Sequence, residues 1–447
     1  MSIYRKIITT GLVALAAAAT PLLAGPAQAA SAQTSGPLAA QPLNIAAIGD
    51  SFASGQGDKG SGWLNDYCYL SSLAAPQQAE ALLNGVRPAT FTTSACNGSV
   101  IEDPTDGYAE SALLGTNGPN GQPLNNGQLS YIDPTRTDPV DALTISIGGN
   151  DIGFANIVTS CVDAFDNCTT DPNVTGIQGY GTVQSALQRL GPYPTDSSGA
   201  PTGRLGDLVK AVNARQDIDN VFLTAYPDPT IAPDGSTCGW GGTYPGFGGF
   251  DAITQPKAEW ASAEVIAPLN AALASTVILA NEQPEPHPVW HFVDLSGAFE
   301  NYGFCAHNRY VNTIADSVLE QGDQNGAMHP NNAGQQALAN DIFHDYISLP
   351  LMSASVSATS SLIVQSSSNL TVQTLNFDNG PIPNAGVWVD GSFVGYTNKA
   401  GNLTFSDTFS TTGDHTIVAR ANGYPDAQAV VSVQTRPYVA ASNPEPI

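Results

Sequence analysis

Basic side chains are scarce in this chain. Its 447 residues include only 14 Lys and Arg against 39 Asp and Glu, and the formal net charge is −25. A surface this acidic repels the phosphates of nucleic acids and the anionic head groups of lipids. The composition therefore argues against a nucleic-acid-binding protein, although it does not name a substrate.

Long apolar runs are also scarce, and the sequence places one at its N-terminus. Residues 7–24 are apolar, follow a short basic start, and precede small residues at 27–29. This order predicts a secretory signal peptide over residues 1–29, with a membrane anchor as the alternative. We find no later run of the ~18 consecutive apolar residues that span a bilayer. We therefore expect a secreted, extracellular protein with no stable membrane anchor.

A third absence concerns the cysteines, none of which form a C-x-x-C pair. That spacing is common in metal sites, whereas six cysteines in an exported chain favour disulfides. Cys161 and Cys168 are near enough in sequence to close a local loop. His287 and His291 are four residues apart, but the proline between them excludes a helical metal pair, so we interpret both as structural. The sequence predicts no metal and no cofactor.

Short apolar runs alternate with helical patterns through most of the chain. Such alternation predicts a parallel sheet with helices on both faces, within a domain of residues 43–350. Ligands bind such sheets at the carboxyl ends of the strands. Two segments rich in Gly, Asn and Pro are expected to form long loops that shape a cleft. The predicted strands are 43–48, 89–94, 142–147, 221–225 and 289–293, the helices 70–84, 151–160, 203–216, 257–281 and 332–347, and the loops 108–140 and 230–252.

The pattern changes near residue 351. Residues 351–363 are expected to form a linker or a first edge strand. Beyond them, short alternating runs are separated by turn signals, with no helical pattern, and predict a small all-β sandwich over residues 364–436. Residues 30–42 and 437–447 are expected to be a disordered lead and a tail. The alternating runs are 368–374, 386–390, 403–405 and 415–420.

Four short blocks supply the groups needed for acyl transfer by a serine enzyme: a nucleophile, two oxyanion donors and a general base. They are, in chain order, Gly49-Asp50-Ser51-Phe52-Ala53-Ser54-Gly55, Gly98, Gly148-Gly149-Asn150-Asp151 and His329-Pro330. Their order and spacing resemble the SGNH/GDSL hydrolase family, in its secreted actinobacterial esterase and lipase type, over about residues 42–350. The resemblance implies a flavodoxin-like three-layer α/β/α fold. The β region looks like the immunoglobulin-like or carboxypeptidase-regulatory-like modules appended to secreted bacterial enzymes.

The resemblance also implies a role for each block. Ser51 is the expected nucleophile, and its turn differs from the G-x-S-x-G elbow of α/β-hydrolases because Ala53 replaces the second glycine. The N–H groups of Ser51 and Gly98 and the side-chain amide of Asn150 are the expected oxyanion donors. His329 is the expected general base, since the residues after it match the start of the family's last helix. The same relatives imply the disulfide pairs Cys68–Cys96, Cys161–Cys168 and Cys238–Cys305.

The sequence departs from the family beside the expected base. The acid that usually lies three residues before the histidine is replaced by Gly326. One alternative is a Ser–His dyad, in which the main-chain carbonyl of Ala327 orients the imidazole, as in some secreted actinobacterial relatives. The other is Asp323, curling back from six residues upstream. We favour the dyad, because a carbonyl is able to fix the tautomer of the ring.

Residues 55–60 match the G-x-G-x-x-G pattern of dinucleotide sites. Those glycines belong at a strand-to-helix turn and open a helix, which the following residues do not predict. We interpret the match as chance and expect a flexible loop beside the cleft.

These motifs favour a secreted serine carboxylic-ester hydrolase, an esterase or lipase that works through an acyl-enzyme. A carbohydrate deacetylase is the alternative enzyme. A non-catalytic surface-binding or adhesion protein is the alternative outside catalysis, motivated by the missing acid and the β module. The expected partner is an ester substrate, whether a lipid, a small ester or an acylated carbohydrate. The β module is a candidate for contact with a polymer or cell surface, and we expect a monomer.

Overall fold

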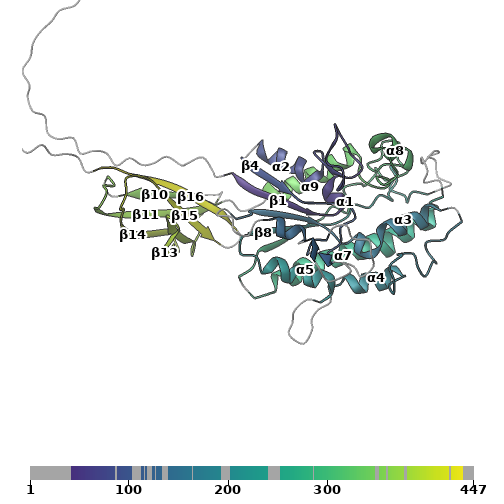
Figure 1. Ribbon diagram of the computed structural model, residues 1–447, viewed down its shortest axis with the longest axis horizontal. Coiled ribbons are helices and arrows are strands. Elements are labelled where there is room, and N and C mark those ends of the chain that lie inside the picture. Colours follow the sequence, from purple (N-terminus) through teal and green to yellow (C-terminus); the bar gives the residue numbers. More distant parts are fainter. Residues whose placement is uncertain are drawn as a thin grey trace, which may run out of the picture.

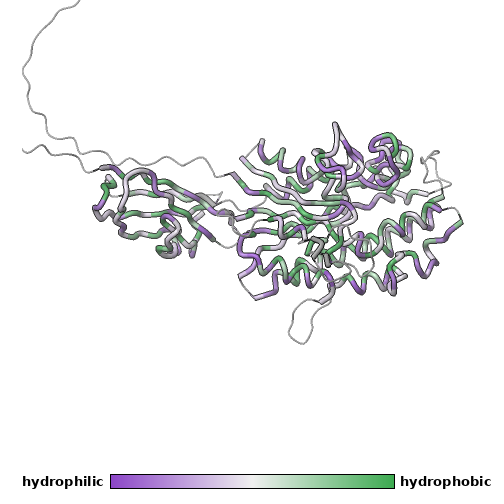
Figure 2. Tube along the Cα trace, viewed as in Figure 1, coloured by the Kyte–Doolittle hydropathy of each residue, from purple (hydrophilic) through white to green (hydrophobic). Residues whose placement is uncertain are grey.

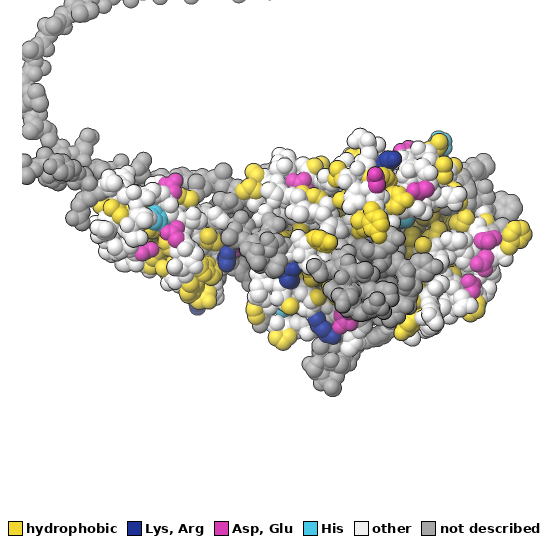
Figure 3. Space-filling model, in the orientation of Figure 1, with side chains coloured by type: hydrophobic (Ala, Val, Ile, Leu, Met, Phe, Trp, Pro, Cys, Tyr) yellow, Lys and Arg dark blue, Asp and Glu magenta, His cyan; other side chains and the backbone are white. Residues whose placement is uncertain are grey.

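The computed structural model describes residues 42–435 apart from several internal segments. Figure 1 shows a larger α/β domain beside a smaller β domain, and Figure 3 shows that basic side chains are sparse on the visible face. The predicted signal peptide, nearly all of the lead, and the tail lie outside the described residues, as does much of both predicted loops. The internal segments left out are 86–87, 103–111, 115, 118–122, 126, 133–138, 164, 193–201, 240–251, 285, 348–351, 359–360, 377–379 and 422–423.

The α/β domain is built on a parallel five-stranded sheet in the order β4-β1-β7-β8-β9. Every strand coincides with a predicted apolar run to within two residues. The central strands β7 and β8 are buried at every position, which explains their continuous apolar sequence. The order is that of flavodoxin-like sheets, so the predicted fold class is confirmed. The strands are β1 (Leu43–Gly49), β4 (Ala89–Thr93), β7 (Ala142–Ser146), β8 (Asn220–Thr224) and β9 (Val289–Val293).

Helices cover the two faces of this sheet, one apolar core lying on each side. On one face α2 (Ala75–Asn84) packs against α9 (Asn332–Ile347). On the other face α4 (Val183–Leu190) and α5 (Gly203–Asn213) pack with the long helix that ends in α7 (Ala267–Asn281). Figure 1 shows the two groups on opposite sides of the strands, and Figure 2 shows apolar residues along the strands and the helices against them.

One described helix is long and apolar enough, by length and composition, to cross a membrane. It runs over Gln255–Asn281 as α6 (Gln255–Trp260), the π-helical η3 (Ala261–Ile266) and α7. Polar residues such as Asn270 and Thr276 interrupt this helix, so it contains no unbroken apolar run of that length. The buried side chains of Leu269, Leu273 and Val277 belong to the core beneath the sheet. A helix that covers a sheet needs this apolar composition to fill its side of the core.

The β domain consists of two antiparallel sheets that enclose a small core of their own. The sequence predicted a linker or a first edge strand over residues 351–363. Residues 352–358 form strand β10. The sequence patterns did not predict β13 or β16. One sheet contains β10 (Met352–Ala358), β11 (Ser367–Asn376) and β14 (Asn402–Thr408), and the other β13 (Ser392–Tyr396), β12 (Gly386–Val389), β15 (Gly413–Ala421) and β16 (Tyr424–Val433).

Shorter elements surround the carboxyl edge of the large sheet. The predicted helix over 70–84 begins only at Ala75, because residues 70–71 pair with a short strand instead. The sequence patterns did not predict helices α4 and α8. The remaining elements are α1 (Ser51–Ser54), β2 (Trp63–Asn65), β3 (Leu70–Ser71), β5 (Thr116–Asn117), β6 (Pro123–Asn125), η1 (Gln128–Tyr131), η2 (Asn150–Ile152), α3 (Phe154–Val162) and α8 (Ile314–Gln321).

Candidate active site

Ser51 lies where β1 ends and the single-turn helix α1 begins. Asp50 caps this helix by accepting a hydrogen bond from the Phe52 N–H at 3.0 Å. Gly49 has φ +141°, and a Cβ there would lie 2.1 Å from the Ser146 carbonyl oxygen. Glycine is therefore required for β1 to turn this closely against β7. The turn directs Ser51 to the carboxyl edge of the sheet, where parallel sheets bind ligands.

His329 contacts Ser51, although the two residues lie 278 positions apart in the sequence. Ser51 Oγ lies 2.8 Å from His329 Nε2, and His329 Nδ1 lies 3.1 Å from the Ala327 carbonyl oxygen. A carbonyl only accepts, so Nδ1 carries the proton and Nε2 is free to accept one from the serine. Burial lowers the pKa of His329 to about 4, despite the opposing effect of the Ala327 carbonyl. At neutral pH the imidazole is an uncharged acceptor.

Asp323 contacts other groups. Its carboxylate accepts hydrogen bonds from Tyr69 Oη at 2.7 Å, from Gln321 Nε2 at 2.6 Å and from the Asn325 N–H at 2.8 Å. These bonds hold the turn that precedes His329 rather than the imidazole itself. Of the two alternatives for orienting the ring, the described geometry has the Ala327 carbonyl.

The two candidate oxyanion donors beyond Ser51 lie in the same cleft. Gly98 has φ +69°, and Asn150 begins η2, four positions after the last residue of β7. One N–H of the Asn150 amide donates to the Ser99 carbonyl at 3.0 Å, which fixes the side chain beside Gly98. Ser51, Gly98, Asn150 and His329 all line a cleft of about 470 Å³. The residues from four separate blocks thus meet at one edge of the sheet.

Two residues that the motifs did not single out connect these blocks. Gln128 accepts from the Gly49 N–H at 2.7 Å, and its amide donates to the Gly49 carbonyl at 2.9 Å and to Ser99 Oγ at 2.8 Å. It ties the nucleophile turn to the loop that carries Gly98. Nothing in the surrounding sequence marks it, since the contacts join segments 29 and 79 residues away.

Tyr226 is the second connecting residue. Its hydroxyl donates a short hydrogen bond to Asp50 Oδ2 and accepts one from the Gly149 N–H at 3.0 Å. Burial raises the pKa of Asp50 to about 7, while the hydrogen bonds from Tyr226 and Phe52 oppose the rise. Tyr226 therefore joins the residue before the nucleophile to the residue before Asn150. In the sequence it marked only the end of a strand.

The glycine-rich segment 55–60 is not the flexible loop predicted from its sequence. Gly57 is buried: its N–H donates to Gln321 Oε1 at 3.1 Å and its carbonyl accepts from Asn312 Nδ2 at 2.6 Å. A Cβ on Gly57 would lie 2.9 Å from His329 Cβ. Because glycine has no Cβ, this backbone packs directly against His329. The glycine here serves close packing rather than flexibility.

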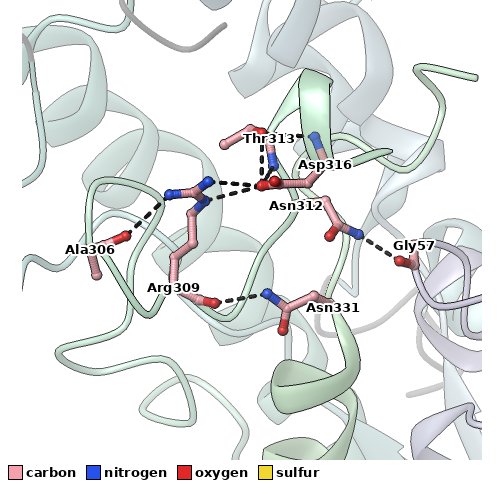
Figure 4. Close-up of polar contacts among 7 residues, drawn as sticks. All are labelled: Gly57, Ala306, Arg309, Asn312, Thr313, Asp316 and Asn331. Atoms are coloured by element: carbon pink, nitrogen blue, oxygen red, sulfur yellow. Dashed lines mark hydrogen bonds and ion pairs between the residues drawn. The ribbon is translucent and has the colours of Figure 1, made fainter. Parts of the chain in front are cut away.

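Figure 4 shows the polar contacts around Arg309, Asn312 and Asp316. Asn312 reaches across to Gly57, while Arg309 binds Asp316 at 2.9 Å and Asp316 accepts from Thr313 in the cap of α8. The backbone around Asn312 pairs with residues 328–330: its N–H donates to the His329 carbonyl at 2.9 Å. His329 is thus held by backbone contacts on both sides.

The cysteines form the three pairs that the resemblance implies: Cys68–Cys96, Cys161–Cys168 and Cys238–Cys305. The first lies against the site, because the Cys96 N–H donates to the Gly49 carbonyl at 3.0 Å. The described residues contain no group of three or more His, Cys, Asp or Glu arranged to hold a metal. His291 Nε2 donates to Asn220 Oδ1 at 3.0 Å, and the ring stacks on Phe222 within the fold.

Comparison with known proteins places this geometry in context. The chain is 34% identical over 199 residues to Lipase 1 of Streptomyces coelicolor, a match that covers 44% of this chain and 57% of that protein. It is 27% identical over 215 residues to a lipase of Streptomyces rimosus, covering 47% and 63%. The chain resembles Streptomyces lipases. The resemblance predicted from the four blocks is thereby confirmed, although the chain spans less than two thirds of either relative.

No family model matches the chain. Among solved structures, it is similar to phospholipase A1 from Streptomyces albidoflavus NA297, with a TM-score of 0.41, 19% identity, and coverage of 68% of this chain and 99% of that one. It is also similar to a family two carbohydrate esterase from Clostridium thermocellum, with a TM-score of 0.33, 14% identity, and coverage of 68% and 64%.

Proposed function

We propose that this protein is a secreted serine carboxylic-ester hydrolase, an esterase or lipase with a Ser–His dyad. The observation that carries the proposal is the 2.8 Å contact between Ser51 Oγ and His329 Nε2 in a cleft also lined by Gly98 and Asn150. A nucleophile in contact with an oriented base, beside candidate oxyanion donors, is the arrangement that acyl transfer requires. The N-terminal sequence and the disulfides support secretion.

In the proposed reaction, Ser51 Oγ attacks the ester carbonyl while its proton passes to His329 Nε2. The negative charge on the carbonyl oxygen is stabilised by the N–H groups of Ser51 and Gly98 and by the Asn150 amide. His329 then gives its proton to the departing alcohol, and a water molecule hydrolyses the acyl-enzyme. The Ala327 carbonyl keeps the ring in the required tautomer and interacts favourably with the imidazolium that forms.

An apolar cavity beside the cleft favours an acyl chain longer than acetyl. It measures about 70 Å³, and Phe154 and Val158 of α3 line both the cavity and the cleft. Phe52, next to the nucleophile, lines the cavity as well. An apolar space this close to the serine suits a hydrocarbon chain, because burying each CH₂ contributes about 0.8 kcal/mol. We therefore place lipase or general esterase before carbohydrate deacetylase.

Hydrolysis of p-nitrophenyl esters from acetyl to palmitoyl tests the proposal. Ser51→Ala should abolish turnover, with a loss on the order of 10⁶ in kcat as for other serine enzymes that lose the nucleophile. Ser54→Ala removes a buried hydroxyl from the same turn and should retain most of the activity. An optimum above acetyl supports the lipase or esterase, whereas an optimum at acetyl supports the deacetylase. A folded wild-type protein with no turnover on any ester would favour a binding protein instead.

A further inference from the structure

An aromatic cluster lies exposed on the β domain, far in sequence from the catalytic residues. Trp388 of β12 lies with its ring centroid 5.3 Å from that of Phe393, which in turn lies 5.1 Å from Tyr396 on β13. Phe393 and Tyr396 are 50% and 64% exposed. A contiguous group of exposed rings is unusual on a soluble protein and generally marks a binding surface. We call these three residues the aromatic surface.

The indole ring in this surface is held in place. Gly386 precedes Trp388 by two residues, on the same side of β12, and a Cβ on it would lie 2.6 Å from the indole. The ring therefore lies over the glycine. Arg420, opposite Gly386 on β15, places its guanidinium carbon 5.0 Å from the ring centroid and binds Asp426 at 2.7 Å. A ring fixed in this way loses little entropy when it binds a ligand.

The aromatic surface borders a groove of about 510 Å³ between the two domains. Trp388 and Tyr396 line it from the β domain, and Pro139, Asp219 and Pro286 line it from the α/β domain. These three precede β7, β8 and β9, so the groove lies at the edge of the large sheet opposite the catalytic cleft. Figure 3 shows hydrophobic side chains gathered on the part of the β domain that faces the larger domain.

Anionic ligands find no free cation among the described residues that line the groove. Arg420 is the one basic residue among them and pairs with Asp426 at 2.7 Å, while Asp217 pairs with Arg215 at 2.6 Å. Phosphorylated molecules, acidic polymers and anionic lipid surfaces therefore lack the basic partner that they require here. A purely apolar ligand would bury the polar groups of Asn384 and of the carboxylates without replacing their hydrogen bonds with water. The remaining class is an uncharged ligand with many hydroxyl groups.

A neutral sugar chain has both features that the groove requires. The C–H faces of its rings pack against aromatic side chains, and its hydroxyls bond to carboxyl and amide groups. Burial raises the pKa of Asp219 to about 8, so at neutral pH this carboxyl is able to donate a hydrogen bond as well as accept one. We propose that the aromatic surface and the adjoining groove bind a neutral polysaccharide. This site holds the chain on a polymer while leaving the cleft at the opposite edge of the sheet open, and it does not depend on the ester-hydrolase proposal.

Affinity electrophoresis of the full chain without its leader tests this binding. Native gels would contain hydroxyethyl cellulose, xylan, galactomannan or β-glucan, each against a gel without polymer. We expect retardation by at least one neutral polymer and affinity about tenfold weaker or more for Trp388→Ala/Tyr396→Ala, since exposed aromatic anchors dominate such interfaces. Tyr131→Ala, which removes an exposed ring from the α/β domain, should bind as the wild type does.

A second variant separates the arrangement of the rings from their mere presence. Gly386→Ala keeps every aromatic residue but displaces the indole, and we expect it to weaken binding while thermal unfolding shows the fold intact. Retardation by none of the neutral polymers, or equal retardation of wild type and double variant, would overturn the proposal. Binding to vesicles of phosphatidylcholine and phosphatidylglycerol, lost in the double variant, would assign the surface to lipid and overturn it too. Turnover of p-nitrophenyl esters, measured on the same variants, reports separately on catalysis.

Discussion

The nucleophile and the base of this site are held in opposite ways. Ser51 follows a buried carboxyl, Asp50, which is hydrogen-bonded by the Phe52 N–H and by Tyr226. His329 has no carboxyl partner among the described residues and contacts only a main-chain carbonyl through Nδ1. A buried carboxyl thus lies next to Ser51, whereas no carboxyl contacts the imidazole among the described residues. The contrast teaches that a buried histidine ring is held here by a main-chain carbonyl and by backbone packed on both sides.

Among changes that leave Ser51 and His329 in place, the largest effect should come from disturbing the backbone beside His329. Gly57→Ala would place a Cβ 2.9 Å from His329 Cβ and 2.7 Å from the Pro330 carbonyl, at φ +100°. We expect kcat/KM to fall about 10²-fold, the cost of a displacement near 1 Å in a catalytic group. Gly62→Ala is the control, because Gly62 also has a positive φ but nothing lies within 4 Å of its Cβ position. Equal activity of the two variants would mean that Gly57 does not position the base.

On the nucleophile side, Tyr226→Phe removes the link between Asp50 and Gly149. We expect kcat to fall about tenfold, as one positioning contact is lost, with a stability loss of about 1–3 kcal/mol for the groups left unpaired. Tyr346→Phe is a matched control, since it removes a buried hydroxyl bonded to Thr144 at 2.6 Å, away from the cleft. It should lose stability and keep kcat. If Tyr226→Phe also loses stability but keeps kcat, the role of Tyr226 is structural only.

Asp323→Asn should change activity little, by less than about threefold, because the carboxylate does not contact the imidazole. Steady-state kinetics on one ester at neutral pH are sufficient to measure this. The loss of a triad aspartate costs on the order of 10⁴-fold. A fall of that size would show that Asp323 reaches His329 during the reaction and would remove the contrast between the two sides of the site.

The smallest effect concerns acid pH. His329 acts as a base only when neutral, and burial lowers its pKa to about 4. On acidification, activity should therefore fall only near pH 4. At pH 5 about nine tenths of the imidazole remains neutral, against about 3% for a pKa of 6.5. The pH dependence of kcat/KM measures this. An inflection near pH 6.5 that stays in place in Tyr226→Phe would indicate a solvated His329. An inflection that moves to higher pH in this variant would belong to Asp50, because the hydrogen bond from Tyr226 lowers the pKa of that carboxyl.

Sequence patterns were sufficient to predict the strands of the large sheet and the candidate site residues that follow them. The five runs of apolar residues predicted all five strands of the large sheet. Ser51 and Asn150 were assigned from the motifs that resemble the SGNH/GDSL family, and each lies shortly after such a run. The groups that connect the blocks could not be predicted. Gln128, Tyr226 and Asn312 act on residues 79, 176 and 255 positions away, and no local periodicity records such contacts.

Other differences have local causes. The choice between Ala327 and Asp323 depended on how the turn before His329 folds, which spacing alone leaves open. The segment around Gly57 was expected to be flexible because glycine usually signals turns, but here it permits close packing. In the β domain, β13 follows β12 in a tight hairpin, and the sequence patterns predicted no run over its residues 392–396.

Ser51 and His329 are separated by 278 positions in the chain, and every strand of the large sheet lies between the start of β1 and the base. A ribosome therefore completes the nucleophile, the oxyanion donors and the whole sheet before it adds the histidine. A nascent chain that stops anywhere before residue 329 holds a serine with no group to take its proton. Under the proposed mechanism, hydrolytic capacity would appear in one step, late in synthesis, rather than growing with the length of the chain.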